Sequence, residues 1–316
     1  MKRVELVTCR SAYGKELAEL GATHPEIVVL DADISKSTCT YHFARVYPER
    51  AFNFGVAEQN MMAAAAGLAA VGKLPFVSTY AVFATMRACE QIRTFIAYPR
   101  MNVRIVATHG GVAVGWDGVT HQGTEDIGMM RTIPGMAVVA PADAVSTRAA
   151  IRGCVSYDGP MYIRLGRNPA PVIYGDEFSF VFGRAYKVAD GTDLTIIGSG
   201  SQLPECIAAR AALAEEGISA RLLDMHTIKP LDEDAVVAAA EETGALVTSE
   251  DHNIHGGLGS AVAAVLARRC PAPMEAVALA DTFGESGDPK LLLEKYGLSA
   301  AHIKAAALRA LARKVG

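Results

Sequence analysis

Short apolar runs alternate with helical patterns along the whole chain, and this alternation limits the possible folds more than any other feature of the sequence. The run at 27–30 is too short for a helix and leads directly into Asp31, which is typical of a buried strand that ends at a polar site. Buried strands that are separated by helices form parallel sheets covered on both faces. The sequence therefore predicts an α/β protein with mainly parallel sheets.

The predicted elements fall into two series. Strands are predicted at 27–30, 76–79, 103–106, 137–139 and 161–164, and then at 194–197, 220–223, 245–248 and 276–279. Helices are predicted at 16–20, 58–71 and 87–98, and then at 204–216, 234–242, 261–269 and 300–314. A stretch with glycine and proline, from about 169 to 183, separates the two series. We therefore predict one domain over 1–175 and a second domain over 185–316.

Composition excludes several classes of protein. The formal net charge of −4 on 316 residues argues against nucleic acid or an anionic membrane surface as the partner. Six cysteines without a CxxC pair indicate reduced thiols in a cytoplasm and not a metal cluster. The longest apolar run, at 61–71, is interrupted by Gly67 and is too short to span a bilayer. We expect a cytoplasmic protein with no nucleic-acid partner and no membrane partner.

The segment at 52–61 carries the first candidate site residue. Gly55 loosens the backbone there, and Glu58 opens an alanine-rich helical pattern. A glutamate in the first turn of a helix interacts favourably with the helix dipole and needs no further function. On composition alone, this structural interpretation of Glu58 is favoured over a catalytic one.

The glycine-rich loop at 109–122 carries His109, Asp117 and His121. Long loops in compact domains are often functional, and imidazoles beside a carboxylate can donate, accept and move protons. The alternatives are a metal site and plain loop packing, although no fourth metal ligand lies nearby in the sequence. We therefore favour a functional interpretation of this loop.

Two arginines, Arg164 and Arg167, lie on either side of Gly166 after the predicted strand at 161–164. They could bind a phosphate bidentately, and a surface ion pair is about as good an interpretation. Neither a P-loop nor a GxGxxG fingerprint occurs, so the usual kinds of nucleotide binding lack support. Ligands of open parallel sheets gather at the carboxyl ends of the strands, which directs attention to Asp31, His109 and this arginine pair.

Taken together, these segments resemble the C-terminal half of transketolases. The resemblance extends over nearly the whole chain, and the order and spacing of its motifs make it specific. The motifs are RSAYG at 10–14, LDAD at 30–33 followed by ST at 37–38, VAEQNM at 56–61, PFVST at 75–79, QIR at 91–93, DGVTHQ at 117–122, IRLGR at 163–167, TIKPLD at 227–232, EDH at 250–252 and GGLG at 256–259.

The resemblance implies a pyrimidine-binding domain followed by a transketolase C-terminal-like domain. Enzymes of this family use thiamine diphosphate, and they hold its diphosphate and a Mg²⁺ (or Ca²⁺) ion with a Gly-Asp-Gly motif in another domain. The present sequence contains no Gly-Asp-Gly. The resemblance therefore implies a split enzyme whose separate N-terminal subunit carries the diphosphate-binding domain and the metal ligands, in an α2β2 assembly.

Three residues match the family's contacts with the cofactor. Glu58 matches the glutamate that bonds N1′ of the aminopyrimidine, which helps the neighbouring amino nitrogen remove the proton from the thiazolium C2. Tyr80 and Phe83 lie where the family has aromatic residues beside the pyrimidine, and Tyr80 replaces a phenylalanine that is common there. A tyrosine ring can still stack on the pyrimidine.

Further matches concern the substrate. The resemblance implies that His109 and His121 bind the hydroxyls and carbonyl of the sugar and move protons, and that Asp117 holds the hydroxyl next to the donor carbonyl. The acceptor phosphate would be bound by Arg10, Ser37 and Arg167. Trp116 departs from the small or acidic residues that are usual before this aspartate, so the donor and acceptor sugars stay open. No metal ligand is expected in this chain.

The leading hypothesis is a transketolase subunit that transfers a two-carbon ketol unit between sugar phosphates and is active only with its partner. A second hypothesis is another thiamine-dependent half-enzyme, either the β subunit of a 2-oxoacid dehydrogenase first component or a relative of deoxyxylulose-phosphate synthase. A third is a non-catalytic scaffold that stabilises the partner chain. Asp117, His121 and the predicted phosphate ligands favour sugar phosphates over 2-oxoacids, and the presence of Glu58 argues against a scaffold.

Overall fold

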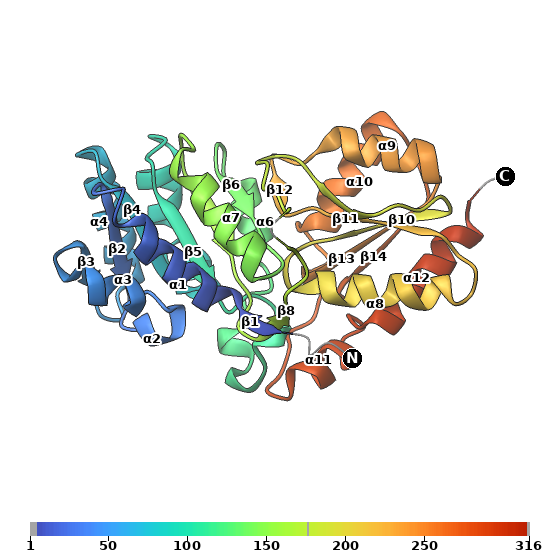
Figure 1. The fold of residues 1–316 in the computed structure, drawn as a ribbon, viewed down its shortest axis with the longest axis horizontal. Coiled ribbons are helices and arrows are strands. Elements are labelled where there is room, and N and C mark those ends of the chain that lie inside the picture. Colours follow the sequence, from blue (N-terminus) through green and yellow to red (C-terminus); the bar gives the residue numbers. More distant parts are fainter. Residues whose placement is uncertain (1–4, 176, 315–316) are drawn as a thin grey trace.

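Two α/β units lie side by side in the computed structural model, which describes residues 5–175 and 177–314 (Figure 1). One unit is built around a seven-stranded sheet and the other around a five-stranded sheet. Most neighbouring strands in both sheets run parallel. The predicted α/β class with mainly parallel sheets is therefore confirmed. Within the described ranges, no helix is both long and apolar enough to cross a membrane.

The seven-stranded sheet has the order β12-β6-β7-β5-β4-β2-β3. Its strands are β2 (Ile27–Asp31), β3 (Ala51–Asn53), β4 (Leu74–Tyr80), β5 (Arg104–Thr108), β6 (Ala137–Val139), β7 (Met161–Arg164) and β12 (Thr227–Lys229). Strand β12 pairs antiparallel with β6, and the other neighbours are parallel. The order is not the order of the chain, so the connecting helices cross over the faces of the sheet.

The five-stranded sheet has the order β14-β13-β10-β11-β9. Its strands are β9 (Tyr186–Ala189), β10 (Leu194–Gly198), β11 (Ala220–Asp224), β13 (Leu246–Asn253) and β14 (Met274–Leu279). The edge strand β9 pairs antiparallel with β11. A separate antiparallel pair joins β1 (Leu6–Thr8) to β8 (Pro169–Pro171), so the start of the described chain is fixed beside the segment that leads into the second unit.

The main helices are α1 (Cys9–Leu20), α4 (Glu58–Ala70), α6 (Asp126–Thr132), α7 (Ala144–Val155), α8 (Leu203–Ala214), α9 (Glu233–Thr243), α10 (Leu258–Arg269), α11 (Pro289–Lys295) and α12 (Ala300–Ala312). Helices α4, α8, α9, α10 and α12 lie where they were predicted, with ends that differ by a few residues, whereas α1 begins seven residues before the predicted start and α6, α7 and α11 were not predicted. Shorter helices and turns are α2 (Ser35–Thr38), α3 (Tyr41–Val46), η1 (Pro48–Arg50), α5 (Cys89–Gln91), η4 (Val112–Asp117), η5 (Val119–His121) and η6 (Gly200–Gln202).

The region predicted as one regular helix over 87–98 has a different structure. Two π-helical turns, η2 (Phe83–Arg87) and η3 (Ile92–Ala97), flank the short helix α5. The segment is helical over most of the predicted range, but it is irregular, because apolar periodicity does not distinguish the hydrogen-bond patterns of these helices. π-helical turns occur frequently at functional sites, and η2 begins at the predicted site residue Phe83.

Alternating side chains of the seven-stranded sheet face different helices. In β2, Val28 and Leu30 pack in one core cluster with Met61 of α4. Ile27 and Val29 point the other way and pack with Leu17 of α1. Because successive strand residues face opposite sides, a strand covered on both faces must be apolar throughout. All five residues of β2 are indeed buried.

Strand β12 belongs to the second half of the sequence but completes the sheet of the first. Thr227 pairs with Val139 and Lys229 with Val138, and the amide of Ala140 donates to the carbonyl of His226 at 2.8 Å. The two units are therefore joined by sheet hydrogen bonds as well as by the connecting chain. The division into domains at 1–175 and 185–316 stays a prediction. Because the two units share a sheet, they are less separate than two independent folding units would be.

We expect the replacement Gly14→Ala to destabilise the chain by roughly 1–3 kcal/mol, the usual effect of overpacking. Gly14 lies in α1, and an added Cβ would overlap the carbonyl oxygen of Cys39, a backbone atom that cannot move aside alone. The matched control is Gly67→Ala in α4, where an added Cβ has open space and helix propensity favours alanine. Urea unfolding of both variants tests this, and equal stabilities would contradict it.

Candidate active site

The predicted site residues gather at the edge of the seven-stranded sheet where its parallel strands end. Tyr80 ends β4, His109 follows β5 and Arg167 lies shortly after β7. Ser37 lies in α2, which follows β2, and Glu58 begins α4, which follows β3. The remaining residues also lie at the ends of elements: Arg10 in the first turn of α1, Phe83 at the start of η2, Asp117 at the end of η4 and His121 at the end of η5. This edge is where open parallel sheets bind ligands.

Glu58 is buried, with only 2% of its surface exposed, and both of its carboxylate oxygens are hydrogen-bonded. Arg87 donates from Nη1 to Oε2 at 2.7 Å, and Thr79 donates from Oγ1 to Oε1 at 3.3 Å. A buried polar group without such partners would be costly, so these two hydrogen bonds stabilise the carboxylate in its buried position. The helix start alone does not explain this arrangement, because a capping glutamate has no need to be buried.

Four ring side chains form a cluster between the strand ends. The rings of Tyr80 and His109 stack with centroids 3.8 Å apart. Phe83 lies 5.7 Å from Tyr80 in a stacked arrangement, and His121 meets Phe83 edge-on at 5.3 Å. The guanidinium of Arg87 lies 4.4 Å from the Phe83 ring centroid and connects this cluster to Glu58. Arg87 therefore links aromatic surface to a buried carboxylate.

Two cationic side chains, Arg10 and Arg167, lie close enough to His109 to act on its charge. Arg10 donates from Nη1 to the carbonyl of Ser37 at 2.7 Å, while its Nε is buried without a hydrogen-bond partner in the described structure. Arg167 lies 3.5 Å from the carboxylate of Asp117. A buried guanidinium nitrogen that is not fully bonded is suited to an anionic ligand, since such a ligand can satisfy it.

His109 is buried and uncharged. Desolvation, reinforced by the positive charges of Arg10 and Arg167 and by His121, lowers the pKa of His109 to about 3. Its Nδ1 forms a hydrogen bond with Thr108 Oγ1 at 2.8 Å, and this leaves Nε2 for other partners. A neutral imidazole has one donor and one acceptor nitrogen, so His109 can form a hydrogen bond with a bound molecule through Nε2.

The turn that carries Ser37 is held by Asp31 at the end of β2. Asp31 accepts hydrogen bonds from the Ile34 amide at 2.7 Å, from Thr38 at 2.9 Å and from Thr40 at 3.0 Å. Burial raises the pKa of Asp31, and these hydrogen bonds oppose the rise. The polar residue at this strand end is therefore a support for the site and not itself a ligand.

The glycine-rich loop is anchored by the second unit of the chain. Both carboxylate oxygens of Asp251, which lies in β13, accept from backbone amides of the loop: Oδ1 from Val112 at 2.8 Å and Oδ2 from Ala113 at 3.1 Å. Gln122 donates to the carbonyl of Glu285 at 2.9 Å, just before α11, which packs against η4. Residues far apart in the sequence thus fix the loop that carries His109, Asp117 and His121.

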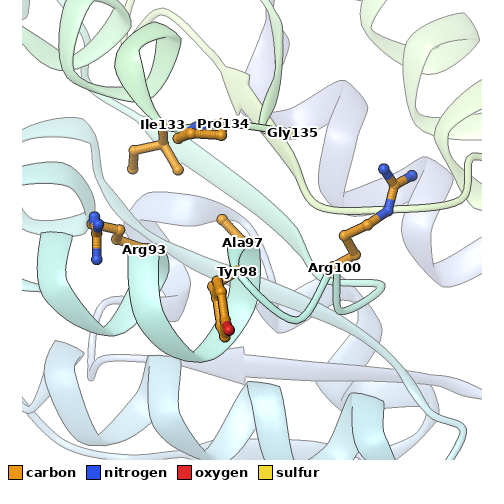
Figure 2. A pocket seen from close by; sticks show the side chains of 7 residues that line it. All are labelled: Arg93, Ala97, Tyr98, Arg100, Ile133, Pro134 and Gly135. Atoms are coloured by element: carbon orange, nitrogen blue, oxygen red, sulfur yellow. The ribbon is translucent and has the colours of Figure 1, made fainter.

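A separate pocket of about 270 Å³ lies away from these residues (Figure 2). It is lined by Arg93, Ala97, Tyr98, Arg100, Ile133, Pro134 and Gly135, and contains none of the predicted site residues. In the described ranges, no group of three or more histidine, cysteine or acidic side chains is arranged to hold a metal ion. The chemistry at the strand ends is therefore that of a carboxylate, aromatic rings, imidazoles and guanidinium groups.

Comparison with protein families assigns both halves of the chain. Residues 5–171 match the family described as transketolase, pyrimidine binding domain, and residues 183–303 match transketolase, C-terminal domain. The chain belongs to the transketolase family. It is of the type that forms the C-terminal section of a split transketolase, as its relatives indicate.

Relatives of this transketolase-type subunit match almost its whole length. A putative transketolase C-terminal section of Methanocaldococcus jannaschii is 48% identical and covers 92% of both chains. The 6-deoxy-6-sulfo-D-fructose transketolase subunit SqwH of Clostridium sp. is 42% identical over 96% of this chain and 95% of its own. A solved structure titled split gene transketolase, inactive beta4 tetramer superimposes with a TM-score of 0.90 at 48% identity, over 98% of this chain and 99% of that one.

Three residues of this transketolase subunit have roles that the sequence did not assign. Arg87 and Asp251 contact the site from 29 and 139 positions away along the chain, distances that no local motif reports. Arg164, considered as a phosphate ligand, is instead buried and donates to Asp126 at 2.9 Å and to the carbonyls of Gly123 and Asp251. The available signal for Asp251 is its place in the EDH motif at 250–252, directly after the predicted strand at 245–248.

Acidification is expected to destabilise this subunit through His109. In the unfolded chain, His109 has a pKa of about 6.5 and binds a proton below that pH. In the folded chain it stays neutral down to about pH 3, so the free energy of unfolding falls as the pH falls across this window. From pH 7 to pH 5 the loss is roughly 2 kcal/mol. His109→Asn cannot be protonated and should show a smaller loss in urea unfolding at the two pH values. Comparison with the unaltered chain separates this effect from other buried groups, and identical pH dependence would contradict it.

Proposed function

We propose that this subunit, together with a separate N-terminal subunit, binds thiamine diphosphate and transfers a two-carbon ketol unit between sugar phosphates. It would thus be a transferase of carbohydrate metabolism in the cytoplasm. The observation that carries the proposal is the burial of Glu58 at the start of α4, with its carboxylate beside the ring cluster of Tyr80 and Phe83. A chain with only a scaffolding role has no need for a buried carboxylate at this position.

The residues present fit the aminopyrimidine end of the cofactor. The Glu58 carboxylate already accepts from a planar N–H donor, the guanidinium of Arg87, so it has the geometry to accept from a planar heterocycle. Phe83 and Tyr80 supply ring surfaces for stacking. When bound, thiamine diphosphate supplies a nucleophilic carbon and an electron sink for breaking the bond next to the carbonyl. Glu58 would hold and share the proton at N1′.

The other residues of the site suit a polyhydroxylated, anionic substrate. The neutral imidazole of His109 and the ring of His121 can bond hydroxyl and carbonyl oxygens and move protons between them. Asp117 can accept from the hydroxyl next to the donor carbonyl. Arg10, with its unbonded Nε, lies beside Ser37 and on the same side of the site as His109, and together with Arg167 these residues would bind the phosphate.

The diphosphate and its metal ion would be held by the N-terminal subunit. The chain contains no Gly-Asp-Gly, and its described residues form no cluster of metal ligands. The relatives are named as a section or a subunit of a transketolase, in keeping with a divided enzyme. We propose that the partner supplies the Mg²⁺ (or Ca²⁺) ligands and that two copies of each subunit form an α2β2 assembly.

The test is an assay of the two-subunit complex with thiamine diphosphate, Mg²⁺, xylulose 5-phosphate and ribose 5-phosphate. The expected product is sedoheptulose 7-phosphate. A second arm replaces the donor with pyruvate, and a third uses 6-deoxy-6-sulfo-D-fructose, because one relative is named for that sugar. Products formed only from pyruvate would support a 2-oxoacid or deoxyxylulose-phosphate synthase-like enzyme. No product from any ketose donor would overturn the proposed transfer.

A further inference from the structure

Arg87 contacts two of the three groups that the cofactor's pyrimidine is proposed to contact, Glu58 and Phe83. Its guanidinium donates to Glu58 Oε2 at 2.7 Å and lies over the ring of Phe83, 4.4 Å from the ring centroid. A guanidinium is planar, carries several N–H donors and stacks on aromatic rings. These are also the properties with which an aminopyrimidine would bond Glu58 and stack on Phe83. The two planar groups therefore compete for the same partners.

The two members of the ion pair differ in their exposure to water. The Arg87 side chain is 44% exposed, whereas the Glu58 side chain is 2% exposed. A partly exposed guanidinium can turn into water at little cost, but a buried carboxylate cannot follow it and cannot remain unpaired. The movable member of the pair is therefore Arg87.

The backbone beneath Arg87 is fixed separately from its side chain. The carbonyl of Arg87 accepts from Gln59 Nε2 at 3.0 Å, and Gln59 is the residue after Glu58 in α4. Arg87 also ends the π-helical turn η2, in which Phe83 is the first residue. The side chain can thus change its rotamer while α4 and η2 keep their relative positions, so the ring of Phe83 and the carboxylate of Glu58 stay in place.

We infer that Arg87 is a positioning residue which holds the Glu58 carboxylate in its orientation in the cofactor-free subunit, and which the aminopyrimidine displaces on binding. The inference rests on the proposed function, because it assumes that the pyrimidine bonds Glu58. The exchange replaces one N–H donor to Glu58 with another, so the buried carboxylate keeps a partner from that side before and after binding. Arg87 thus keeps Glu58 paired when no cofactor is bound. Because it competes for Glu58, it also lowers the apparent affinity for the cofactor.

The test is titration of the assembled two-subunit complex with thiamine diphosphate at saturating Mg²⁺, followed by calorimetry. Arg87→Gln removes the charge and the planar guanidinium, so any bond that its amide still makes to Glu58 is neutral and weaker, and its complex should bind the cofactor about tenfold more tightly. Arg87→Lys keeps a positive charge for Glu58 but cannot stack as a planar group, so its affinity should lie between the two. Arg93→Gln, at an exposed arginine further along the same region, is the matched control for net charge and should leave the affinity unchanged.

The outcomes separate this inference from the proposed function. An unaltered complex that binds no thiamine diphosphate overturns both. An unaltered complex that binds it, with Arg87→Gln and Arg87→Lys no tighter, overturns the role of Arg87 alone. If Arg87→Gln does not fold because Glu58 loses its partner, the lysine variant decides: affinity equal to or weaker than that of the unaltered complex overturns the inference, and tighter binding supports it. A purely structural role would lower the unfolding temperature without tightening cofactor binding.

Discussion

Replacement of Glu58 with alanine is expected to lower the turnover number of the assembled enzyme by about 10²- to 10⁴-fold, the range typical of a group that handles a proton at the reacting centre. The carboxylate is buried and is already bonded to Thr79 and Arg87, so its position is set by the fold before any cofactor binds. Alanine removes the acceptor for the pyrimidine N–H and leaves the rings of Tyr80 and Phe83 in place. The loss should therefore appear in turnover more than in assembly.

The experiment compares Glu58→Ala with Glu241→Ala in the two-subunit complex. Glu241 is an exposed residue of α9 in the other unit, so its replacement changes the net charge equally without touching the site. Size-exclusion chromatography should show that both variants assemble with the partner, and Glu241→Ala should retain turnover. A Glu58→Ala complex with unchanged turnover would support the scaffold hypothesis and contradict the catalytic one.

The apolar elements of the fold were predictable from the sequence. Buried strands such as β2 and β6 consist mainly of apolar residues, and a helix such as α12 follows the apolar periodicity. Short edge strands were not predictable: β12 has only three residues, and its place in the seven-stranded sheet depends on pairing with β6 from the other half of the chain. Pairing of this kind is decided by tertiary contacts, which leave no local pattern.

Helix α7 shows a missed element for which the sequence did contain a signal. Asp143 accepts from the Ser146 amide, and the Ser146 hydroxyl accepts from the Asp143 amide, which together form a capping box at the start of the helix. An aspartate followed three residues later by a side chain that can bond back is a recognisable helix start. The helix following it carries Ile151 and Cys154 into the core beside α1, as its apolar spacing would predict.

The residues of the candidate site were predictable from the sequence, but the residues that hold them in place were not. Residues such as Glu58 and His109 were assigned by the resemblance of local motifs, and the structure gathers them at one sheet edge. Their roles stay predictions. Arg87 and Asp251 act through contacts with residues far away in the sequence, and a charged side chain gives no indication of its partner until the chain is folded. The sequence therefore indicated which chemistry is present and left open what holds it in place.

Replacement of Asp251 with alanine is expected to destabilise the subunit by about 3–5 kcal/mol, the usual effect of removing one member of a buried charged network. Asp251 is 2% exposed, and its carboxylate bonds the amides of Val112 and Ala113 and offsets part of the charge of Arg164. Without it, at least the buried Val112 amide is left unpaired, and the guanidinium loses a nearby negative charge.

The same replacement is expected to lower kcat/KM, because the loop that Asp251 anchors carries His109, Asp117 and His121, and small misplacements of such groups reduce rates strongly. Asp251→Asn keeps one acceptor oxygen for a backbone amide, so its losses of stability and of kcat/KM should be smaller than those of the alanine variant. Some loss should remain, because the side-chain amide places a donor toward the other backbone N–H. The control is Asp234→Ala, at an exposed ion pair with Arg269 that should contribute no more than about 1 kcal/mol. Urea unfolding of the free subunit and turnover of the complex measure the two effects. If both Asp251 variants matched the Asp234 control in stability and in kcat/KM, the loop would not depend on this anchor, and the second unit would have no part in shaping the site.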